Sequence, residues 1–447
     1  MANASPARVA AVRLLGETRR RNARARELLR ASSCMETLDA RDRAFVSRLV
    51  MGVVGTRGLL DSVVDVHVAK RAHLEPKVRD ALQLAAYELL FLSTASSVAV
   101  SQGVELVRLA RPRAAGMANA VLRRIADEDV PKRMAAVARC EAGQCDVEDL
   151  ALVCGYPTWL LNAVVRQRGI EAARRFARSA MEPAPVYVAA NEIICTADQA
   201  SGLLASMGME PEWVELPGAF VLGAPAGLAQ SGLVDEAKIV VADLSAQRVA
   251  QLVAPSPGAW VLEVGQGRGT KSILMQNAAW RAGGLARIAG VDSEPFKVEV
   301  ARRRMASAGL EDVVSCTAFD ACRLGEDSVP DELVGAFDTV FVDAPCSGTG
   351  TLRRHPEIAW NLSLADVGAL AALQLRMLEA AATRVQDGGT LCYATCSILS
   401  EENEDVVDGF LAGKVGASFA RGKRGFAELP SLNGPDGHFC VTLIKVR

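Results

Sequence analysis

The chain has 447 residues, of which 50% are hydrophobic and 23% are charged, and its formal net charge is −2. This composition excludes an intrinsically disordered chain, and the length predicts two or three domains instead of a single core. We find no uncharged apolar run of about 18 residues and no apolar stretch of a secretory signal. We therefore expect a cytoplasmic protein without a membrane span.

The eleven cysteines and four histidines do not predict disulfides or a metal site. The cysteines are odd in number and scattered along a large chain, which favours reduced thiols. No Cys-x-x-Cys pair occurs, and the histidines are dispersed. We expect neither a structural zinc ion nor another metal.

Residues 1–128 have the pattern of an all-α domain with a basic surface. Apolar residues recur at helical spacing between residues 82 and 92, and helices are also expected over 9–29, 41–54 and 116–125. The segment holds 21 Lys and Arg against 13 Asp and Glu, whereas the remainder holds 29 basic and 39 acidic residues. This asymmetry favours contact with a polyanion such as nucleic acid, although solvated arginine-rich helix faces give the same pattern.

The remaining chain is predicted to form two further domains. Residues 129–235 are expected to be a small α+β connector, with a helix that starts at Pro157 and short strands in PVYVAANEI and AFVLGAP. In residues 236–447, strand-like runs alternate with helical segments, which predicts a parallel, doubly wound sheet. The runs are AWVLEV, ARIAGVD, VVSCTAFD, FDTVFVDAP, GTLCYATC and CVTLIKV. Ligands of such sheets bind at the carboxyl ends of the strands.

A glycine-rich turn follows the first of these strands, in the sequence WVLEVGQGRGT. Gly265, Gly267 and Gly269 allow a tight turn and the close approach of a ligand to backbone N–H groups. With Glu263, the turn resembles the E/D-x-G-x-G-x-G loop of class I methyltransferases, which implies a site for S-adenosylmethionine. Dinucleotide-binding proteins use similar turns, so the loop by itself leaves both cofactors open.

Two aspartates end the next two strands of the predicted sheet. Asp292 closes the run ARIAGVD, where a carboxylate can accept hydrogen bonds from ribose hydroxyls. Asp320 closes the run VVSCTAFD, where an acid can contact the adenine end of a cofactor. Each could also be a simple loop cap, but Glu263, Asp292 and Asp320 at three successive strands favour a cofactor site.

Two cysteines lie just beyond the following strands, in DAPCSGTG and YATCS. In a parallel sheet this places Cys346, Cys396 and Asp343 near one another, at the edge where the cofactor is expected. Cys392 lies inside its strand, where a cysteine is usually a small buried hydrophobe. Cys346 and Cys396 are the better candidates for chemistry.

The segments D-A-P-C-S-G-x-G and T-C-S resemble the hallmark motifs of the Nop2/Sun family of RNA 5-methylcytosine methyltransferases. The segments DRAFVSRLVMGVVGTRGLLD and MANAVLRRI resemble the NusB-like helical RNA-binding domain. The two resemblances together cover nearly the whole chain. They imply a multidomain fold, with an all-α NusB-like domain (1–128), a small α+β connector (129–235) and an α/β class I (Rossmann-like) methyltransferase domain (236–447).

The resemblance implies a covalent mechanism. Cytosine C5 is a poor nucleophile, but addition of a thiolate to C6 makes C5 reactive toward a sulfonium methyl. Cys396 would be that nucleophile, Cys346 would assist release of the methylated base, and Asp343 would hold the edge of the cytosine. The thiol must first ionise, which a nearby cation favours by lowering its pKa.

The resemblance also implies a cofactor site and an RNA surface. Asp292, Asp320 and Lys271 would bind S-adenosylmethionine together with the glycine loop, and Asp343 would lie beside the cofactor. The segment RRHPEIAW matches a family segment near the substrate, which predicts RNA contacts for Arg353, Arg354 and His355. An exposed basic turn would have the same sequence. The implied partner is ribosomal RNA of the small subunit, bound by a monomer without a membrane or a metal.

The chain departs from the family pattern at the cofactor loop. The family usually has D-x-C-A-A-P-G-G-K-T, whereas this chain has Gly265 in place of the cysteine and Arg268 in place of the proline. The change leaves the cysteine motifs intact. Two alternatives stay open. One is a transfer RNA cytosine-C5 methyltransferase, since related catalytic domains serve that substrate. The other, which the altered loop favours, is an inactive RNA-binding assembly or antitermination factor.

Overall fold

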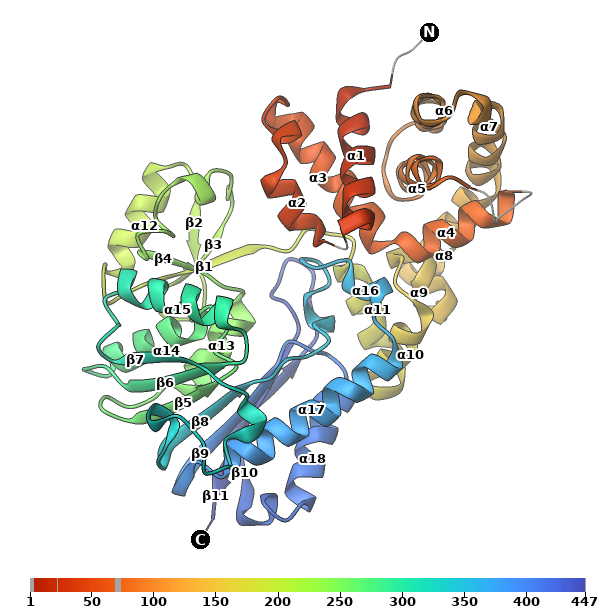
Figure 1. Cartoon of the computed structure of the whole chain (residues 1–447). Coiled ribbons are helices and arrows are strands. Elements are labelled where there is room, and N and C mark those ends of the chain that lie inside the picture. Colours follow the sequence, from red (N-terminus) through yellow and green to blue (C-terminus); the bar gives the residue numbers. More distant parts are fainter. Residues whose placement is uncertain (1–3, 22, 69–73, 447) are drawn as a thin grey trace. The chain divides into compact units, whose positions relative to one another are not determined.

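The computed structural model describes residues 4–21, 23–68 and 74–446 of the chain (Figure 1). The chain forms two compact units, which are described separately. The helical unit comprises Met1–Glu182 and Thr351–Leu362, and the sheet unit comprises Pro183–Gly350 and Ser363–Arg447. The connector predicted over 129–235 is therefore divided: its helices before residue 183 belong to the helical unit, whereas its strands and the helix Ala197–Ser206 belong to the sheet unit.

The described part of the helical unit is all-α, as predicted for the N-terminal domain. Its elements are α1 (Pro6–Arg21), α2 (Ala25–Ala31), α3 (Ala40–Gly55), α4 (Arg57–His67), α5 (Pro76–Phe91), α6 (Ser96–Ala110), α7 (Ala115–Arg124), a π-helical turn (Ile125–Asp129), α8 (Val130–Glu141), α9 (Val147–Cys154), α10 (Thr158–Arg168), α11 (Ile170–Ser179) and α16 (Ile358–Asn361).

Local signals account for where several of these helices begin. Asp39 accepts a hydrogen bond from the Asp42 backbone N–H at 2.7 Å and caps α3. Pro76 opens α5. Pro157 immediately precedes α10, where the sequence predicts the start of a helix. The single helix predicted over 9–29 is instead two helices, because Arg24 has an extended backbone and separates α1 from α2.

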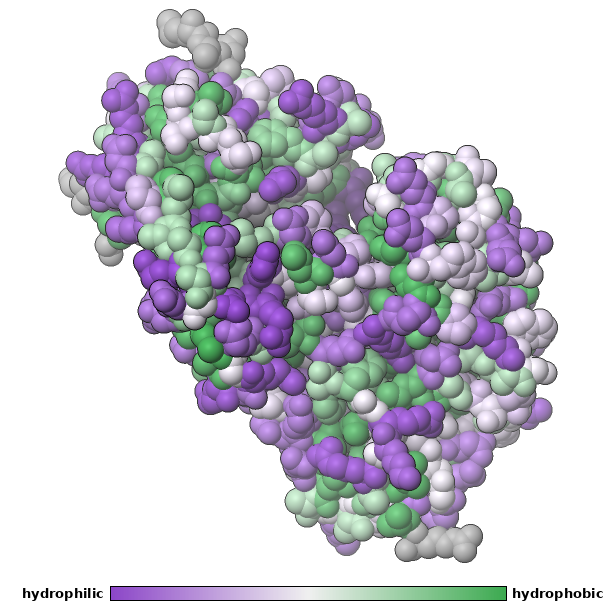
Figure 2. Space-filling model, turned by 180° about the vertical axis from the view of Figure 1, so that it is seen from behind, coloured by the Kyte–Doolittle hydropathy of each residue, from purple (hydrophilic) through white to green (hydrophobic). Residues whose placement is uncertain are grey.

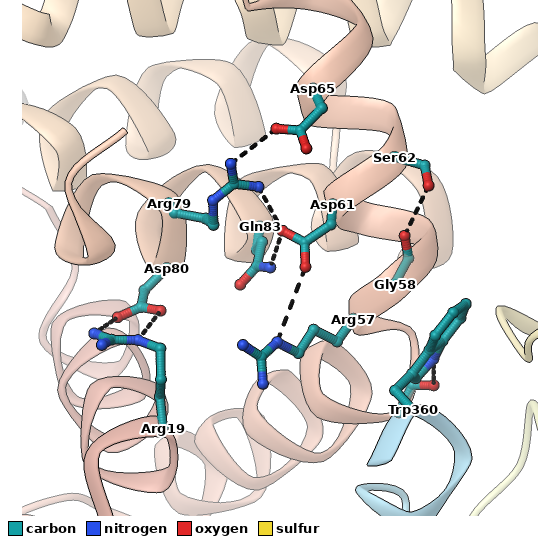
Figure 3. A network of polar contacts seen from close by, with 11 residues as sticks. Arg19, Arg57, Gly58, Asp61, Ser62, Asp65, Arg79, Asp80, Gln83 and Trp360 are labelled. Atoms are coloured by element: carbon teal, nitrogen blue, oxygen red, sulfur yellow. Dashed lines mark hydrogen bonds and ion pairs between the residues drawn. The ribbon is translucent and has the colours of Figure 1, made fainter. Parts of the chain in front are cut away.

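Ion pairs link the helices around the apolar core of this unit (Figure 3). The Arg79 guanidinium on α5 donates to Asp61 and Asp65 of α4 at 2.6 and 2.9 Å. Arg19 of α1 pairs with the buried Asp80 of α5 at 3.0 Å. Burying a charge costs free energy unless the charge is paired. The ion pair with Arg19 offsets this cost at Asp80 and links α1 to α5.

The segment Thr351–Leu362 belongs to the helical unit, although it immediately follows one of the cysteine motifs. The Trp360 indole N–H donates to the Gly55 carbonyl oxygen at 2.9 Å (Figure 3). A Cβ atom at Gly58 would lie 2.1 Å from the Trp360 ring, and one at Gly55 would lie 3.0 Å from Pro356. These two glycines therefore allow the segment to pack closely on α3 and α4.

The sheet unit alternates strands and helices. Its elements are β1 (Val186–Ala190), α12 (Ala197–Ser206), β2 (Pro211–Trp213), β3 (Ala219–Leu222), β4 (Ile239–Val241), α13 (Leu244–Val253), β5 (Trp260–Val264), α14 (Thr270–Arg281), β6 (Arg287–Asp292), α15 (Pro295–Ser307), β7 (Val314–Ala318), β8 (Phe337–Asp343), α17 (Leu364–Ala382), β9 (Val385–Thr395), α18 (Glu404–Ala412), β10 (Phe419–Glu428) and β11 (His438–Lys445).

The main sheet has seven strands in the order β10-β11-β9-β8-β5-β6-β7. The five strands from β9 to β7 are parallel, and the β10–β11 hairpin adds antiparallel to β9. Helices α13, α14 and α15 cover one face, and α17 and α18 cover the other (Figure 1). This is the doubly wound α/β fold that the sequence predicts. Strands β1 to β4 form a separate antiparallel sheet in the order β2-β3-β1-β4.

The outer surface mixes residue types. The face shown in Figure 2 carries hydrophilic and hydrophobic side chains side by side in both units. None of the helices described in the structure is long and apolar enough to cross a membrane.

Candidate active site

The glycine-rich loop after β5 is packed against the loop after β8. Gly265 has a φ of 79°, and a Cβ atom there would lie 2.2 Å from the Asp343 carbonyl oxygen. Gly265 therefore lets the two loops touch at the carboxyl edge of the sheet. Gly267, with a φ of 61°, has only the Gly265 oxygen within 4 Å of its ideal Cβ position, at 3.9 Å. Space for a ligand is thus left beside the loop, in front of the first turn of α14, where Gly269 is the N-cap.

Asp292 and Asp320 lie where the sequence predicts them, at the ends of two strands beside the loop. Asp292 accepts hydrogen bonds from the backbone N–H groups of Gly267 at 3.0 Å and Glu294 at 2.9 Å. A carboxylate has about four acceptor sites, so it can hold the loop and still accept from ribose hydroxyls. Asp320 is exposed and caps a short turn through the Cys322 N–H at 3.0 Å. The positions of Asp292 and Asp320 fit the binding of S-adenosylmethionine. Direct contacts between these two aspartates and the cofactor stay predictions.

Glu263 occupies a different environment from the other two acids. It is 1% exposed, and it accepts a hydrogen bond from the Ser272 hydroxyl at 2.5 Å. Burial raises the pKa of Glu263 to about 8, so the side chain is uncharged at neutral pH. Gln266 donates to the same Ser272 hydroxyl at 3.1 Å. The hydrogen-bonded side chains of Glu263, Ser272 and Gln266 support the glycine-rich loop from inside the protein. Direct contact between Glu263 and a cofactor stays a prediction.

Lys271 and Asp343 form an ion pair between α14 and the end of β8. The Lys271 ammonium lies 2.6 Å from an Asp343 carboxylate oxygen, and the lysine side chain is largely buried. Burial lowers the pKa of Lys271, but the negative charges of Asp343 and Cys396 outweigh it and the pKa is raised. The cation is therefore retained at the site, beside the Asp343 carboxylate.

The structure brings the two predicted cysteines together. The sulfur atoms of Cys346 and Cys396 lie 3.0 Å apart, and both residues are partly exposed. They are 50 positions apart in the sequence and meet because β8 and β9 are parallel neighbours. Cys392 is fully buried inside β9, as expected for a packing residue.

Backbone hydrogen bonds hold three loops together around the two sulfurs. The Gly350 N–H donates to the Cys396 carbonyl oxygen at 2.9 Å, and the Gly437 N–H donates to the Gly350 oxygen at 2.9 Å. A Cβ atom at Gly350 would lie 2.0 Å from the Gly437 oxygen, so only glycine fits at this crossing. The loops after β8 and β9 and the one before β11 are thereby fixed relative to one another.

Two residues near the sulfurs were missed in the sequence. Burial and the charge of Lys271 lower the pKa of His438 to about 4, and the imidazole is therefore neutral at physiological pH. His438 begins β11, and its neighbour Phe439 pairs with Thr395, the residue before Cys396. Glu402 is 0% exposed and accepts hydrogen bonds from the loop that carries Cys346. Its place in the sequence SEENE, beyond the cysteine motif, was the available signal.

The residues predicted to contact RNA lie in the helical unit. Arg353, Arg354 and His355 follow the first cysteine motif along the chain, in the segment Thr351–Leu362. Burial and the positive charges of Arg24, Arg26 and Arg354 together lower the pKa of His355 to about 4. The structure thus joins the predicted basic turn to arginines at the start of α2. We call Arg24, Arg26, Arg353 and Arg354 the basic cluster.

Across residues 4–21, 23–68 and 74–446, no group of three or more His, Cys, Asp or Glu side chains is arranged to hold a metal ion.

Two known protein families match two parts of this chain. Residues 250–423 match the family described as 16S rRNA methyltransferase RsmB/F, and residues 5–127 match the NusB family. The crystal structure of the protein PH0851 covers 99% of both chains with a TM-score of 0.78 at 22% identity, which shows a shared fold.

Curated relatives extend the similarity along most of the chain. Ribosomal RNA small subunit methyltransferase B of Salmonella typhi is 28% identical, over 91% of each chain. Putative methyltransferase Rv1407 of Mycobacterium tuberculosis is 32% identical, over 88% of this chain and 83% of the relative. The chain therefore belongs to the RsmB/F family: it is an S-adenosylmethionine-dependent RNA (cytosine-C5)-methyltransferase with an N-terminal NusB-family domain.

Proposed function

We propose that this enzyme methylates C5 of a cytosine in 16S ribosomal RNA through a transient bond between Cys396 and C6 of the base. The observation that carries this proposal is the pair of sulfurs, 3.0 Å apart, beside the Lys271–Asp343 ion pair. One nucleophile, one second thiol and one carboxylate beside a cation are the groups that the reaction needs.

The first step is formation of the Cys396 thiolate and its attack on C6. Lys271 stabilises the negative sulfur by its charge. Cys346 can donate its S–H proton toward that sulfur, which stabilises the thiolate further. As the new S–C6 bond forms, the electron pair of the C5–C6 double bond moves toward C5 and the N3 side of the ring. The target base must leave its stack to reach the sulfur.

Asp343 supplies base recognition. Its carboxylate oxygens accept hydrogen bonds, and cytosine presents an exocyclic amine that donates them. Uracil has an oxygen at that position, which a carboxylate repels. Lys271 keeps the carboxylate in place, with its ammonium 2.6 Å away. The pair therefore favours cytosine over uracil.

The second step restores the aromatic base. Bound S-adenosylmethionine supplies the methyl group that C5 takes up. A base then removes the proton from C5, the electron pair of the C5–H bond re-forms the C5–C6 double bond, and the Cys396 sulfur leaves with the electrons of its bond to C6. Cys346 lies beside the departing sulfur, and we assign it to this release step.

The basic cluster is proposed to contact the phosphate backbone of the RNA. Its arginines come from two segments far apart in the sequence, and the charges of Arg24, Arg26 and Arg354 act together on His355. Replacing Arg24 and Arg26 together by alanine should weaken RNA binding at every sequence tested and reduce the salt dependence by about one unit of slope per lost contact. Fluorescence anisotropy over a salt series measures both quantities. The paired change Lys414→Ala and Lys423→Ala, at exposed sites of the sheet unit, is the matched control.

Base-resolution mapping tests the 16S substrate. Bisulfite sequencing of ribosomal and transfer RNA should show a single cytosine in 16S RNA that loses its methyl group when the gene is deleted and regains it on complementation. Loss confined to transfer RNA would reject the ribosomal substrate and leave the chemistry intact. Calorimetry that shows no binding of S-adenosylmethionine would favour an inactive RNA-binding protein.

A further inference from the structure

A cavity lies within the helical unit, between helices α1, α3, α4 and α5 and the segment Thr351–Leu362. Its volume is about 110 Å³, several times the roughly 10–15 Å³ that one buried water needs. Every residue that lines it belongs to the helical unit. The lining residues drawn in Figure 3 are Arg19, Arg57, Asp80, Gln83 and Trp360. The cavity is therefore a feature of this unit by itself, and it can admit a ring.

Part of the lining is apolar and rigid. Leu15, Val53 and Val54 are buried and line the cavity. The partly exposed Trp360 ring is held in place by its N–H bond to the end of α3 and by close packing on Gly58 of α4. A fixed aromatic ring beside apolar side chains is the kind of surface on which proteins bind nucleobases.

Two hydrogen-bond acceptors line the cavity without a donor in the part of the chain that the structure describes. The Gln83 amide nitrogen donates to the Asp61 carboxylate at 2.8 Å, which leaves the Gln83 oxygen as an acceptor (Figure 3). The Glu357 Oε2 atom is buried and has no hydrogen-bond partner among the described residues. An unsatisfied buried acceptor costs free energy, so a ligand that donates a hydrogen bond here would recover it.

Arginines supply positive charge around the same cavity. Arg24 and Arg57 line it with exposed side chains, and the nearest carboxylate oxygen lies 3.9 Å from each guanidinium. Such groups can bind a phosphate. The buried Asp80 does not oppose this, because its charge is paired with Arg19 at 3.0 Å. Arg24 also belongs to the basic cluster, so the cavity adjoins the surface proposed to contact RNA phosphates.

An aromatic wall, hydrogen-bond acceptors and neighbouring cations are together the features of a nucleotide site. We propose that this cavity binds one base of the RNA, a base that carries an exocyclic amine, while the adjoining phosphates contact the basic cluster. The amine donates to Glu357, which uracil cannot match because it has no amine. Inorganic phosphate alone would leave the apolar lining unused. The inference rests on the proposed contact between the basic cluster and RNA, and the base site is what is new.

Fluorine NMR of the full-length chain tests the site directly. The chain has five tryptophans, which can be labelled with fluorine, and Trp360→Phe identifies the signal of Trp360. Guanosine monophosphate (GMP) is the probe, because guanine is neither the target cytosine nor the adenine of the cofactor. Inosine monophosphate (IMP) has the same ring without the amine. Both should shift the Trp360 signal saturably, GMP with about tenfold higher affinity.

Two outcomes would overturn the proposal at this stage. No shift of the Trp360 signal with either nucleotide would mean that the cavity is not a nucleotide site. Equal affinity for GMP and IMP would mean that the amine is not recognised. If Trp360→Phe does not fold, single phenylalanine replacements of the remaining tryptophans identify the signal by elimination.

Replacing Glu357 isolates the acceptor. Glu357→Leu should reduce the preference for GMP over IMP from about tenfold to less than about twofold, because the partner of the amine is lost. The ratio is the readout, since removal of a negative charge beside the phosphate affects both nucleotides alike. Glu141→Leu, at an exposed position of the same unit, is the matched control and should keep the preference. A full preference in folded Glu357→Leu would refute the role of Glu357. If that variant does not fold, the comparison of GMP with IMP on the unmodified chain decides.

A single-stranded RNA decamer separates an RNA base from a free nucleotide. Uridines with one central guanosine should shift the Trp360 signal at lower concentration than GMP, because the neighbouring phosphates reach the basic cluster. Inosine in place of that guanosine should weaken the response. A response to GMP without a response to the decamer would show that the cavity takes a free nucleotide, and would overturn RNA as the ligand.

These titrations need no methyl transfer, so they stand apart from the proposed reaction. Loss of the covalent mechanism in the methylation assays would leave a GMP preference at Trp360 intact. Unchanged RNA affinity in the double variant Arg24→Ala and Arg26→Ala would reject the phosphate contact of the basic cluster. A preference for the guanosine decamer over the inosine decamer in that same variant would still support the base site.

Discussion

Replacing Cys396 by serine should reduce methyl transfer to RNA by a factor on the order of a thousand or more, since the attacking group is lost. A serine hydroxyl does not ionise near neutral pH, and the charge of Lys271 cannot compensate for so large a difference. Transfer of a labelled methyl group from S-adenosylmethionine to RNA measures the loss. Affinity for RNA and for S-adenosylmethionine should stay unchanged, because the loops around the site are held by backbone hydrogen bonds.

A cysteine outside the site provides the control. Cys145 lies in the helical unit and is partly exposed, so Cys145→Ser makes the same chemical change away from the sheet edge. It should keep full activity. Methylation by Cys396→Ser within about tenfold of the unmodified enzyme would show that the covalent mechanism is wrong.

Replacing Cys346 by alanine should have the second large effect, which is to trap the enzyme on its RNA. Attack by Cys396 and uptake of the methyl group can still occur, because Lys271 and Asp343 remain. Release fails, because the group beside the departing sulfur is gone. The Cys346 loop keeps its place through Glu402, which contacts Ser347 and not the Cys346 side chain. A protein–RNA band that survives a denaturing gel is the expected result.

The double variant Cys346→Ala and Cys396→Ser separates a covalent product from tight binding. It should give no band, since the bond to C6 cannot form. A band of equal strength in the double variant would mean that another side chain makes the link. Ordinary turnover by Cys346→Ala, without a band, would remove Cys346 from the release step.

Much of the main sheet could be predicted from the sequence. Apolar runs bounded by turns marked β5, β6, β8 and β9, because central parallel strands are buried on both faces. Similar runs also marked the edge strand β7 and the antiparallel strand β11. Strand β10 was missed. Its sequence FARGKRGFAE is basic and glycine-rich, with an irregular register between Arg421 and Gly425. An edge strand of this kind pairs on one side alone and lacks the apolar pattern of a buried one.

The domain boundaries were harder to predict. The helices α8 to α11 lie in the helical unit, beyond the boundary expected at residue 128, and Thr351–Leu362 returns to the same unit. Amphipathic periodicity shows that a helix has an apolar face, but it does not show which partner covers that face. The packing of Trp360 on Gly58 is an example, because neither segment contains a local pattern that predicts contact with the other.

The sequence by itself predicted which candidate catalytic residues meet at one edge of the sheet. Asp343, Cys346 and Cys396 were identified because each lies at or just beyond the end of a strand, and the carboxyl ends of parallel strands meet at one edge of a sheet. Their motifs also resemble those of the family. The tertiary structure alone decided which charges lie near these groups and how deeply the groups are buried. Charge and burial depend on through-space distances, so the pairing of Lys271 with Asp343 and the carboxylate of Glu402 behind Cys346 emerge only when the chain is folded.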